Sequence, residues 1–240
     1  MAVYRLADLI LQVDGANEYT SRVLSRYQAD AAKAGKPDIF VSVTSDMVDR
    51  EQRIEGERFS RDYLECMAVY RAFCEQALRY DVLFFHASAV ALDGEDYLFT
   101  GPSGIGKSTH ARMWREAFGK EVVMINDDKP LLRFRPDGVY AYGTPWDGKH
   151  HLNTDIRLKI KGICLLEQAE SNRLQKISFA EAHDRILSQS FHAEQWEQRQ
   201  KAGNMINLLL NQVPVYRLEC NISPQAAWVA RQGMKDAEKK

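Results

Sequence analysis

The sequence predicts a mixed α/β fold in which helices flank a mixed sheet. Three observations predict it: apolar runs of strand length alternate with helical patterns, Asp93-Gly94-Glu95 joins two apolar runs as a hairpin turn would, and a glycine-rich loop at 101–106 stands between a strand and a helix. The chain has no internal repeat, low-complexity tract or Pro/Gly/Ser-rich linker. We therefore expect one domain, with residues 1–80 as a small N-terminal α/β subregion and residues 81–240 as the loop-bearing core.

The N-terminal subregion contains four segments with a recognisable pattern. Residues 4–13 and 38–43 alternate in polarity as strands do, and residues 17–34 have helical spacing that ends near Gly35. From residue 60 to about residue 79, apolar side chains recur at intervals of three and four. This spacing predicts a helix with one buried stripe, which consists of Tyr63, Met67, Tyr70, Phe73 and Ala77.

The core supplies the remaining elements. Strands are predicted at 82–92, 97–99, 122–125, 131–134, 139–142, 160–166 and 215–220. Helices are predicted at 109–118, near 179–191, near 194–210, and from Pro224 onward.

Composition and charge exclude several classes of protein. The formal net charge of −1 gives no basic field for a nucleic-acid backbone or an anionic membrane. The longest apolar runs, such as 82–85 and 208–210, are far shorter than the roughly 20 residues that a membrane span needs. The N-terminal segment also lacks the basic start of a signal peptide, so we expect a cytoplasmic protein without nucleic-acid or membrane partners.

The cysteines do not indicate a metal site or a disulfide framework. Cys66, Cys74, Cys164 and Cys220 are widely spaced and form no CxxC pair. We expect buried, reduced thiols that serve packing.

Residues 101–108 read Gly-Pro-Ser-Gly-Ile-Gly-Lys-Ser and match the complete GxxxxGK[ST] pattern of a phosphate-binding loop (P-loop). The glycines let the backbone curl so that successive N–H groups point inward, and the following helix adds the positive potential of its N-terminus. Lys107 would bring a charge to the outer phosphates, and Ser108 offers a hydroxyl to Mg²⁺. The alternative is a glycine-rich turn that only precedes a helix. We expect ATP and Mg²⁺ as ligands, and the nucleotide-binding residues are Gly101, Ser103, Gly104, Ile105, Gly106, Lys107, Ser108 and Thr109.

Two adjacent carboxylates, Asp127 and Asp128, follow the apolar strand that comes about twenty residues after Lys107. Neighbouring strand residues point to opposite sides, so the two side chains should differ in role. One would face the metal, and the other would face an acceptor hydroxyl as a general base. A polar turn after a strand is the alternative interpretation.

His86 lies on the strand that precedes the hairpin. A single histidine on a strand is usually structural. Here the hairpin would carry this end of the strand toward the edge of the P-loop, so a role in orienting a phosphate or the base stays open beside the structural one.

Residues 143–153 form a segment between two strands that is rich in polar and aromatic side chains. Loops of this kind on a rigid scaffold tend to bind ligands. The adjacent histidines have no further ligand spacing that would indicate a metal site. We predict an acceptor-binding loop, with a plain solvated turn as the alternative, and its substrate-binding residues are Asp147, Lys149, His150, His151 and Asn153.

The combination of His86-Ala-Ser-Ala, residues 101–109 and Asn126-Asp-Asp resembles the catalytic domain of HPr kinase/phosphorylase and its related kinases. The resemblance covers about residues 82–170 and implies a fold similar to the nucleotide-binding core of phosphoenolpyruvate carboxykinases. It implies that Lys107 contacts phosphates and Ser108 contacts Mg²⁺. It also implies that Asp128 is the base that takes the proton of the substrate hydroxyl, with His86 beside the reacting phosphate. Asp127 is then the metal-facing carboxylate.

The chain departs from this family at two places. The strand start Leu158-Lys-Ile-Lys-Gly162 lacks the family's acidic metal ligand, so a second carboxylate is missing or comes from elsewhere, with Asp147 as the candidate. We also find no counterpart of the later segment that the family uses for its phosphorylase reaction and its protein substrate. A small molecule with a hydroxyl group is therefore favoured over a protein as acceptor.

Two functions of different classes remain open on the sequence. The first is an ATP-dependent kinase that acts on a hydroxyl of a small metabolite or on a Ser of a peptide or protein. The second is a nucleotide-binding regulatory ATPase or switch without an acceptor. The Asp pair and the 143–153 loop favour the kinase, because a pure binding module needs neither. The acceptor's identity, the choice among ATP, GTP and pyrophosphate as donor, a reverse reaction and homo-oligomer formation are left open.

Overall fold

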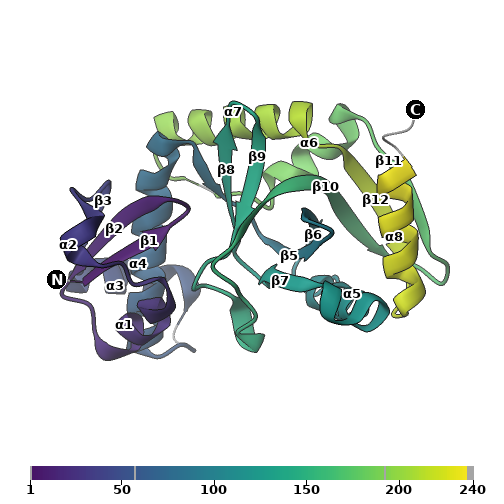
Figure 1. Cartoon of the computed structure of the whole chain (residues 1–240). Coiled ribbons are helices and arrows are strands. Elements are labelled where there is room, and N and C mark those ends of the chain that lie inside the picture. Colours follow the sequence, from purple (N-terminus) through teal and green to yellow (C-terminus); the bar gives the residue numbers. More distant parts are fainter. Residues whose placement is uncertain (1, 57, 192, 237–240) are drawn as a thin grey trace. The chain divides into compact units, whose positions relative to one another are not determined.

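A computed structural model describes residues 2–56, 58–191 and 193–236 (Figure 1). Its contacts divide the chain into two units, residues 1–82 and 83–240. Each unit has its own sheet and its own covering helices.

The first unit contains a sheet of order β1-β2-β3, formed by β1 (Ala2–Leu6), β2 (Leu9–Asp14) and β3 (Ile39–Ser42). β1 and β2 are antiparallel, whereas β2 and β3 are parallel. The prediction of one strand over residues 4–13 is wrong, because Ala7 and Asp8 form a tight turn with φ of +48° and +58°. Positive φ at both central residues reverses the chain inside a pattern that looks continuous in the sequence.

Four helices belong to the first unit: α1 (Glu18–Leu24), α2 (Ala31–Ala34), α3 (Ser45–Glu55) and α4 (Arg61–Ala77). The predicted helix at 17–34 is interrupted by a 3₁₀ turn at Ser25–Tyr27 and an extended Gln28, so it forms two short helices. α3 was not predicted. α4 confirms the predicted helix: Ser60 caps its first turn, and Met67, Tyr70, Phe73 and Ala77 are buried. Tyr63, which was predicted to be buried with them, is only half-buried.

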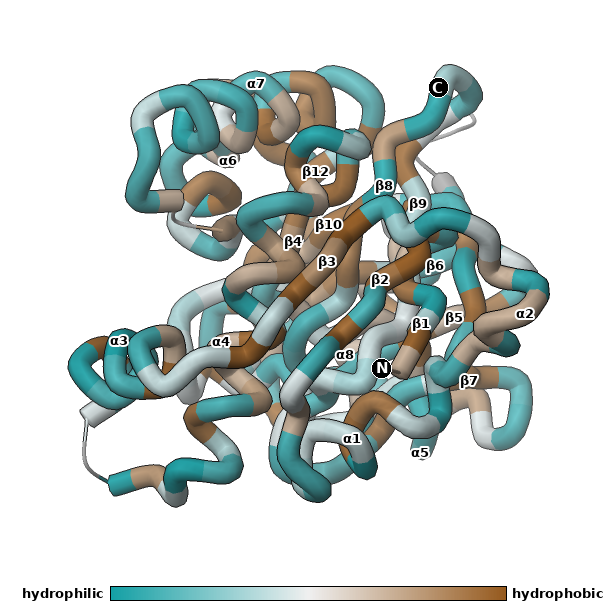
Figure 2. The backbone as a smooth tube through the Cα atoms, turned by 90° about the vertical axis from the view of Figure 1, so that its left-hand side faces the viewer, coloured by the Kyte–Doolittle hydropathy of each residue, from teal (hydrophilic) through white to brown (hydrophobic). Residues whose placement is uncertain are grey.

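The hydropathy pattern explains how this small sheet is held. β2 and β3 bear apolar segments (Figure 2), and their buried side chains include Leu11, Val13 and Val41. α4 packs against β3, α1 and α3. Glu51 of α3 is buried and is paired with Arg71 of α4, which compensates the buried charge.

The second unit is built on a mixed sheet. Its described strands are β4 (Val82–Phe84), β5 (Ala87–Leu92), β6 (Glu95–Thr100), β7 (Val123–Asn126), β8 (Leu131–Arg135), β9 (Gly138–Tyr142), β10 (Arg157–Gln168), β11 (Arg173–Lys176) and β12 (Val215–Cys220). Their order is β4-β8-β9-β10-β6-β5-β7, and β12 pairs with both β10 and β11. β11 was not predicted, and the predicted run at 82–92 is divided at residues 85–86 into two strands with different partners.

β10 contacts different neighbours along its length. Residues 157–159 pair with β9, and residues 160–165 pair with β6. The register shifts between Ile160 and Gly162, and the last six residues of the strand pair with β12. Both β6 and β12 are parallel to β10, so the sheet is mixed.

Helices α5 (Lys107–Phe118), α6 (Phe179–Leu187), α7 (Trp196–Gln212) and α8 (Pro224–Asp236) flank this sheet. α5 packs against α8, and α6 packs against α7. The main core places Trp114 of α5 and Met234 of α8 against Phe99, Tyr97 and Leu218 of the sheet. The prediction of a mixed sheet flanked by helices is confirmed. The finer prediction of a core similar to HPr kinase and phosphoenolpyruvate carboxykinase stays a prediction.

Two further expectations can be compared with the structure. Cys66, Cys74 and Cys164 are buried, as expected, whereas Cys220 is only half-buried. Among the described residues, no helix is long and apolar enough to cross a membrane.

Asp96 on β6 is a buried carboxyl group whose two oxygens have no side-chain partner among the described residues. Burial raises the pKa of Asp96 well above 3.8, against the opposing effect of the Tyr97 backbone N–H. A group whose pKa is higher in the folded chain than in the unfolded chain contributes its full stabilisation at pH values below the pKa that it has in the unfolded chain. That stabilisation is lost as the pH rises, because the unfolded chain releases a proton that the folded chain retains.

We predict that Asp96→Asn removes the decrease in stability that accompanies rising pH. The free energy of unfolding of the wild type should fall as the pH rises above the unfolded-state pKa of about 4, and the variant should be the more stable of the two proteins at pH 8. Denaturant unfolding at pH 5 and at pH 8 measures the difference. A variant that is less stable than the wild type at pH 8 would contradict the buried, proton-bound state of Asp96.

Candidate functional site

The candidate site lies at one edge of the larger sheet, where three strands end or begin. β5 is antiparallel to both β6 and β7, with Ala87 opposite Thr100 and Ala89 opposite Asn126. The carboxyl ends of β6 and β7 therefore lie beside the start of β5. The Thr100 hydroxyl donates to the His86 carbonyl at 2.7 Å, which ties the start of the P-loop to the histidine segment.

The P-loop joins β6 to α5 as the motif predicts. Gly101, Gly104 and Gly106 have φ of +144°, +80° and +112°, values that side chains other than glycine rarely adopt. Ser103 and Gly104 are exposed, whereas Ile105, Ser108 and Thr109 are half-buried. The curled backbone thus meets the N-terminus of a helix of 12 residues, the arrangement that binds anionic groups.

Lys107 folds back over this loop. Its ammonium group donates to the carbonyl oxygens of Gly101 at 3.0 Å and Pro102 at 3.2 Å. Burial lowers the pKa of Lys107 below its ordinary value, while the charges of Asp128 and Asp127 act in the opposite direction. The positive charge therefore lies at the loop, where two carbonyl oxygens accept its hydrogen bonds.

Asp127 is buried beside the first turn of α5. It accepts a hydrogen bond from the Ser88 hydroxyl at 2.8 Å and another from Ser108. Burial raises the pKa of Asp127, although these two hydrogen bonds and the nearby His150 oppose the shift. The hydroxyl and carboxylate oxygens gathered here suit a hard cation such as Mg²⁺.

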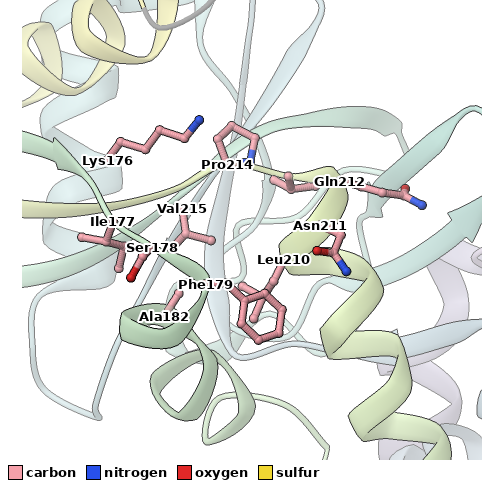
Figure 3. A pocket seen from close by; sticks show the side chains of 11 residues that line it. Lys176, Ile177, Ser178, Phe179, Ala182, Leu210, Asn211, Gln212, Pro214 and Val215 are labelled. Atoms are coloured by element: carbon pink, nitrogen blue, oxygen red, sulfur yellow. The ribbon is translucent and has the colours of Figure 1, made fainter.

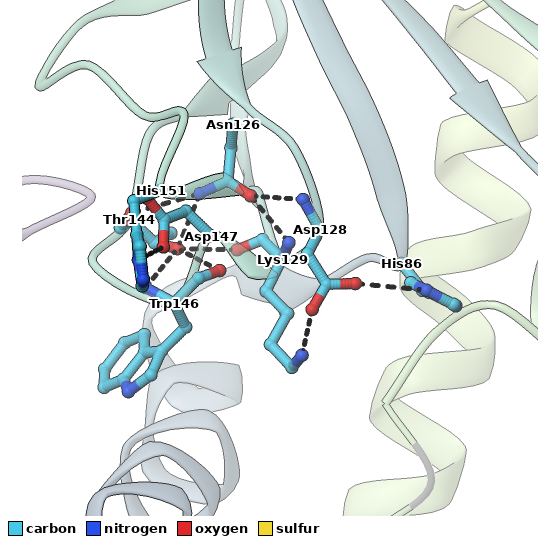
Figure 4. Close-up of polar contacts among 8 residues, drawn as sticks. All are labelled: His86, Asn126, Asp128, Lys129, Thr144, Trp146, Asp147 and His151. Carbon is cyan, nitrogen blue, oxygen red and sulfur yellow. Dashed lines mark hydrogen bonds and ion pairs between the residues drawn. The ribbon is translucent and has the colours of Figure 1, made fainter. Parts of the chain in front are cut away.

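Asp128 has a different set of partners (Figure 4). His86 Nε2 lies 3.2 Å from one oxygen, and the Lys129 ammonium is paired with the other. Burial favours the neutral carboxyl group, but the hydrogen bond from His86 and the charge of Lys129 outweigh it and hold the pKa of Asp128 at about 2. Asp128 is therefore ionised at neutral pH.

Asn126 connects the Asp pair to the 143–153 loop. Its side-chain oxygen accepts from the backbone N–H groups of Asp128 at 2.8 Å and Lys129 at 2.6 Å. Its amide nitrogen lies 3.0 Å from both the carbonyl and the hydroxyl oxygen of Thr144. A Cβ at Gly143 would lie 1.8 Å from the Thr154 carbonyl oxygen, so only glycine permits this close approach.

The residues predicted in the 143–153 loop fall into two groups. Asp147 is buried and accepts hydrogen bonds from His151 and Asn153 within the loop, so both of its oxygens have partners there. Lys149, His150 and His151 are exposed. Gly148 of the loop lies close to Asp128, because an added Cβ would lie 3.1 Å from the Asp128 Cβ. His150 interacts electrostatically with Asp127 and lowers its pKa.

A cavity of about 480 Å³ adjoins the P-loop on the side of α5. Its lining includes Ile105, His110, Met113, Leu166, Gln168 and Ile222. His110 is nearly fully buried, and burial lowers its pKa to about 3. A second cavity of about 360 Å³ lies between the start of α6 and the end of α7 (Figure 3), and none of the predicted site residues lines it.

Sequence reasoning missed several residues of the site. Ser88, Lys129, Thr144 and the cavity residue His110 were not predicted. Ser88 and Lys129 are neighbours of predicted residues, but no spacing marks them as contacts of Asp127 and Asp128. Among the described residues, no group of three or more His, Cys, Asp or Glu side chains is arranged to hold a metal. A second metal ligand at Asp147 therefore stays a prediction.

Comparison with known proteins gives similarity to solved structures but not to known sequences. No protein-family model and no curated protein match the chain. The Hpr(Ser) kinase/phosphatase from Coxiella burnetii is a structural neighbour at 11% identity, with 65% of this chain and 94% of that chain covered and a TM-score of 0.37. Similarity at this level carries no weight for function, so the function must be inferred from the site's own geometry.

The hydrogen bonds of Asn126 give a testable prediction. Asn126→Ala removes the acceptor for the backbone N–H groups of Asp128 and Lys129. It also removes the amide that contacts Thr144, so the free energy of unfolding should fall by roughly 2–4 kcal/mol. Turnover should also fall at temperatures where the variant is folded, because Asp128 and the 143–153 loop lose their common support. Thermal unfolding and activity assays measure both effects.

Asn17→Ala is the matched control for this experiment, because it removes a helix cap in the other unit at a cost of about 1 kcal/mol. It should leave the turnover of the folded protein unchanged. Equal losses of turnover in the two variants would mean that Asn126 has no special role in the site.

Proposed function

We propose that the chain is an ATP-dependent phosphotransferase that moves the γ-phosphoryl group of ATP to a hydroxyl group of a small molecule. One observation carries this proposal: a complete P-loop lies at the same sheet edge as two carboxylates that have different partners. Asp127 contacts Ser108 of the loop, and Asp128 contacts His86. This is the division of roles that phosphoryl transfer needs.

Nucleotide binding would use the P-loop and Lys107. The curled backbone presents N–H groups to the phosphates, and the helix terminus favours their negative charge. Lys107 would exchange its two carbonyl partners for phosphate oxygens, which form stronger, charge-assisted hydrogen bonds. The phosphates would also oppose the effect of burial on the pKa of Lys107.

Ser108 and Asp127 would hold the Mg²⁺ that accompanies ATP. When bound, this ion supplies positive charge that neutralises the β- and γ-phosphate oxygens. Ser88 would keep Asp127 in place through its hydrogen bond.

The transfer step would take place beside Asp128. The acceptor oxygen forms a bond to the γ-phosphorus while the bond to the oxygen bridging the β- and γ-phosphorus breaks, and ADP leaves. Asp128 accepts a hydrogen bond from the acceptor hydroxyl and takes its proton as the new bond forms. His86 holds the carboxylate in position through its contact at 3.2 Å.

Acceptor binding is proposed for the 143–153 loop. Gly148 lies against Asp128, and the exposed Lys149, His150 and His151 follow at once along the chain. Asp147 and Asn153 would order this loop through their mutual hydrogen bond. Polar side chains at this place suit a small molecule with hydroxyl groups, and a Ser of a peptide is the less favoured acceptor.

Lys107→Ala should weaken the binding of Mg²⁺·ATP and abolish detectable turnover, because the loop's N–H groups leave most of the phosphate charge uncompensated. Calorimetry and a phosphate-transfer assay measure the two effects. Lys120→Ala removes an exposed lysine beyond α5 and should change neither. Unchanged affinity and turnover in Lys107→Ala would show that the loop does not bind nucleotide.

Asp128→Asn should leave Mg²⁺·ATP binding nearly intact and lower phosphoryl transfer at least about a hundredfold, because the amide cannot take the proton. Asp127→Asn should instead shift the Mg²⁺ dependence as well as the rate. Transfer to the acceptor, measured over a Mg²⁺ titration, separates the two phenotypes. The exposed Asp137→Asn serves as control.

Two outcomes would change these assignments. Exchanged phenotypes of the two variants would mean that the roles of Asp127 and Asp128 are reversed. Wild-type transfer in Asp128→Asn would remove the general-base role.

A further inference from the structure

Lys129 is a basic side chain that lies directly beside the carboxylate of Asp128. Its ammonium group is paired with one oxygen of Asp128 (Figure 4), and its side chain is 21% exposed. Its backbone is fixed on both sides, because its N–H donates to the Asn126 side-chain oxygen at 2.6 Å and its carbonyl accepts from the Thr144 hydroxyl at 2.8 Å. The ammonium group is thus within reach of a ligand from solvent, and it can change its partner while the backbone stays in place.

This pairing places Lys129 where the acceptor has to bind. His86 Nε2 lies 3.2 Å from one oxygen of Asp128, and Lys129 is paired with the other oxygen. An acceptor hydroxyl that donates to Asp128 therefore meets one of these two groups. Lysine carries its ammonium group on a flexible stem of four carbons, whereas the ring of histidine is attached to the backbone through one carbon. Lys129 is therefore the partner that can withdraw from Asp128.

A lysine that withdraws from a half-buried carboxylate needs another anion. The pair is a charge-assisted hydrogen bond, and its loss is costly when nothing replaces it. The partner that Lys129 gives up is a carboxylate. A carboxylate on the acceptor would therefore restore the same kind of bond.

The exposed surface of the 143–153 loop also favours an anionic acceptor. Its exposed side chains include Lys149, His150 and His151. Its single acidic residue, Asp147, is buried and accepts hydrogen bonds from two other residues of the loop. The loop thus presents basic groups to a ligand and keeps its own carboxylate away from it.

The shared position of Lys129 and the acceptor hydroxyl limits the size of the acceptor. Both groups are neighbours of the Asp128 carboxylate, so the hydroxyl and the carboxylate of the acceptor can be no further apart than roughly two hydrogen-bond lengths, or about 6 Å. A hydroxyl group on the first or second carbon after the carboxyl group meets this condition.

We propose that the acceptor is a short hydroxy acid whose carboxylate binds Lys129 while its hydroxyl group donates to Asp128. The inference rests on the proposed phosphotransferase function and names the chemical class of its acceptor. As Lys129 exchanges its partner, the hydroxyl oxygen bonds to the γ-phosphorus, and the bond from that phosphorus to the bridging oxygen breaks. Asp128 takes the hydroxyl proton, and ADP leaves.

Pairs of acceptors that differ only in the charge of one group test this class. The pairs are lactate and lactamide, glycerate and glyceramide, and 3-hydroxybutyrate and 3-hydroxybutyramide. With Mg²⁺·ATP and the wild type, we expect transfer within at least one pair, and kcat/KM for the acid should exceed that for the amide at least about tenfold. This ratio decides the class of acceptor without any variant.

Three variants then test the role of Lys129 in the preference for the acid. Lys129→Met should reduce the ratio to about twofold or less, because the charge that binds the carboxylate is lost. Lys129→Arg keeps the positive charge and should retain most of the preference. Lys120→Met removes an exposed lysine beyond α5 and should leave the ratio at the wild-type value.

The γ-phosphate is another anion that Lys129 could bind, and calorimetry separates it from the acceptor. Lys129→Met should bind Mg²⁺·ATP within about twofold of the wild-type affinity, because Lys107 and Mg²⁺ bind the phosphates. A variant that loses ATP affinity and keeps the wild-type ratio of acid to amide would assign Lys129 to the nucleotide and overturn the proposal.

ATP hydrolysis gives a second measurement that does not depend on the choice of acceptor. Acetate has a carboxylate but no hydroxyl group, so it should bind Lys129 and leave water as the acceptor. The water oxygen bonds to the γ-phosphorus, Asp128 takes its proton, and ADP and phosphate leave. At constant ionic strength, acetate should raise the wild-type rate at least about tenfold. Acetamide should not raise it, and Lys129→Met should not respond to acetate.

Two results would overturn the hydroxy-acid acceptor and leave nucleotide binding by the P-loop intact. One is equal transfer to acids and amides by the wild type. The other is transfer to none of the six compounds together with hydrolysis that acetate does not change. A wild type that does not bind Mg²⁺·ATP would overturn the proposed function as well.

Discussion

The antiparallel pairing of β5 with both β6 and β7 is the constraint on which the site depends. Two strands that are each antiparallel to a third must be parallel to each other, so β6 and β7 end at the same edge. The P-loop follows β6, and the Asp pair follows β7, while His86 stands just before β5. Backbone hydrogen bonds between the strands thereby bring together three separate segments of the chain, independently of their side chains.

Buried polar contacts then give the two adjacent carboxylates different properties. Asp127 accepts hydrogen bonds from two hydroxyl groups, and burial raises its pKa. Asp128 contacts His86 and Lys129, and its pKa is about 2. Asn126 holds Asp128 and Lys129 in place, because its side-chain oxygen accepts hydrogen bonds from their backbone N–H groups. Interactions of this kind are strong in a low-dielectric interior, and they are costly when one partner is missing.

Local patterns predicted much of the fold. The Asp93-Gly94 turn, the helix that begins after residue 60 and the strand at 215–220 depend on nearby residues, and the structure confirms them. The Ala7-Asp8 turn and the break at residues 85–86 were missed, because partner strands decide them and periodicity cannot show partners. The same limit applies to the site: the glycine-rich motif is contiguous and can be recognised in the sequence, whereas the Trp114 to His110 contact depends on side-chain packing.

β10 runs from the 143–153 loop to the cavity beside α5. The strand has 12 residues and spans about 40 Å, with the 143–153 loop before it and the cavity residues Leu166 and Gln168 near its end. A shift of one residue in the pairing of β10 with β12 would turn the side chains of that stretch to the opposite face, so this register is constrained. The loop before Arg157 has no such restriction. We therefore expect that insertions ahead of this strand would be tolerated without a change in how β10 pairs with β6 and β12.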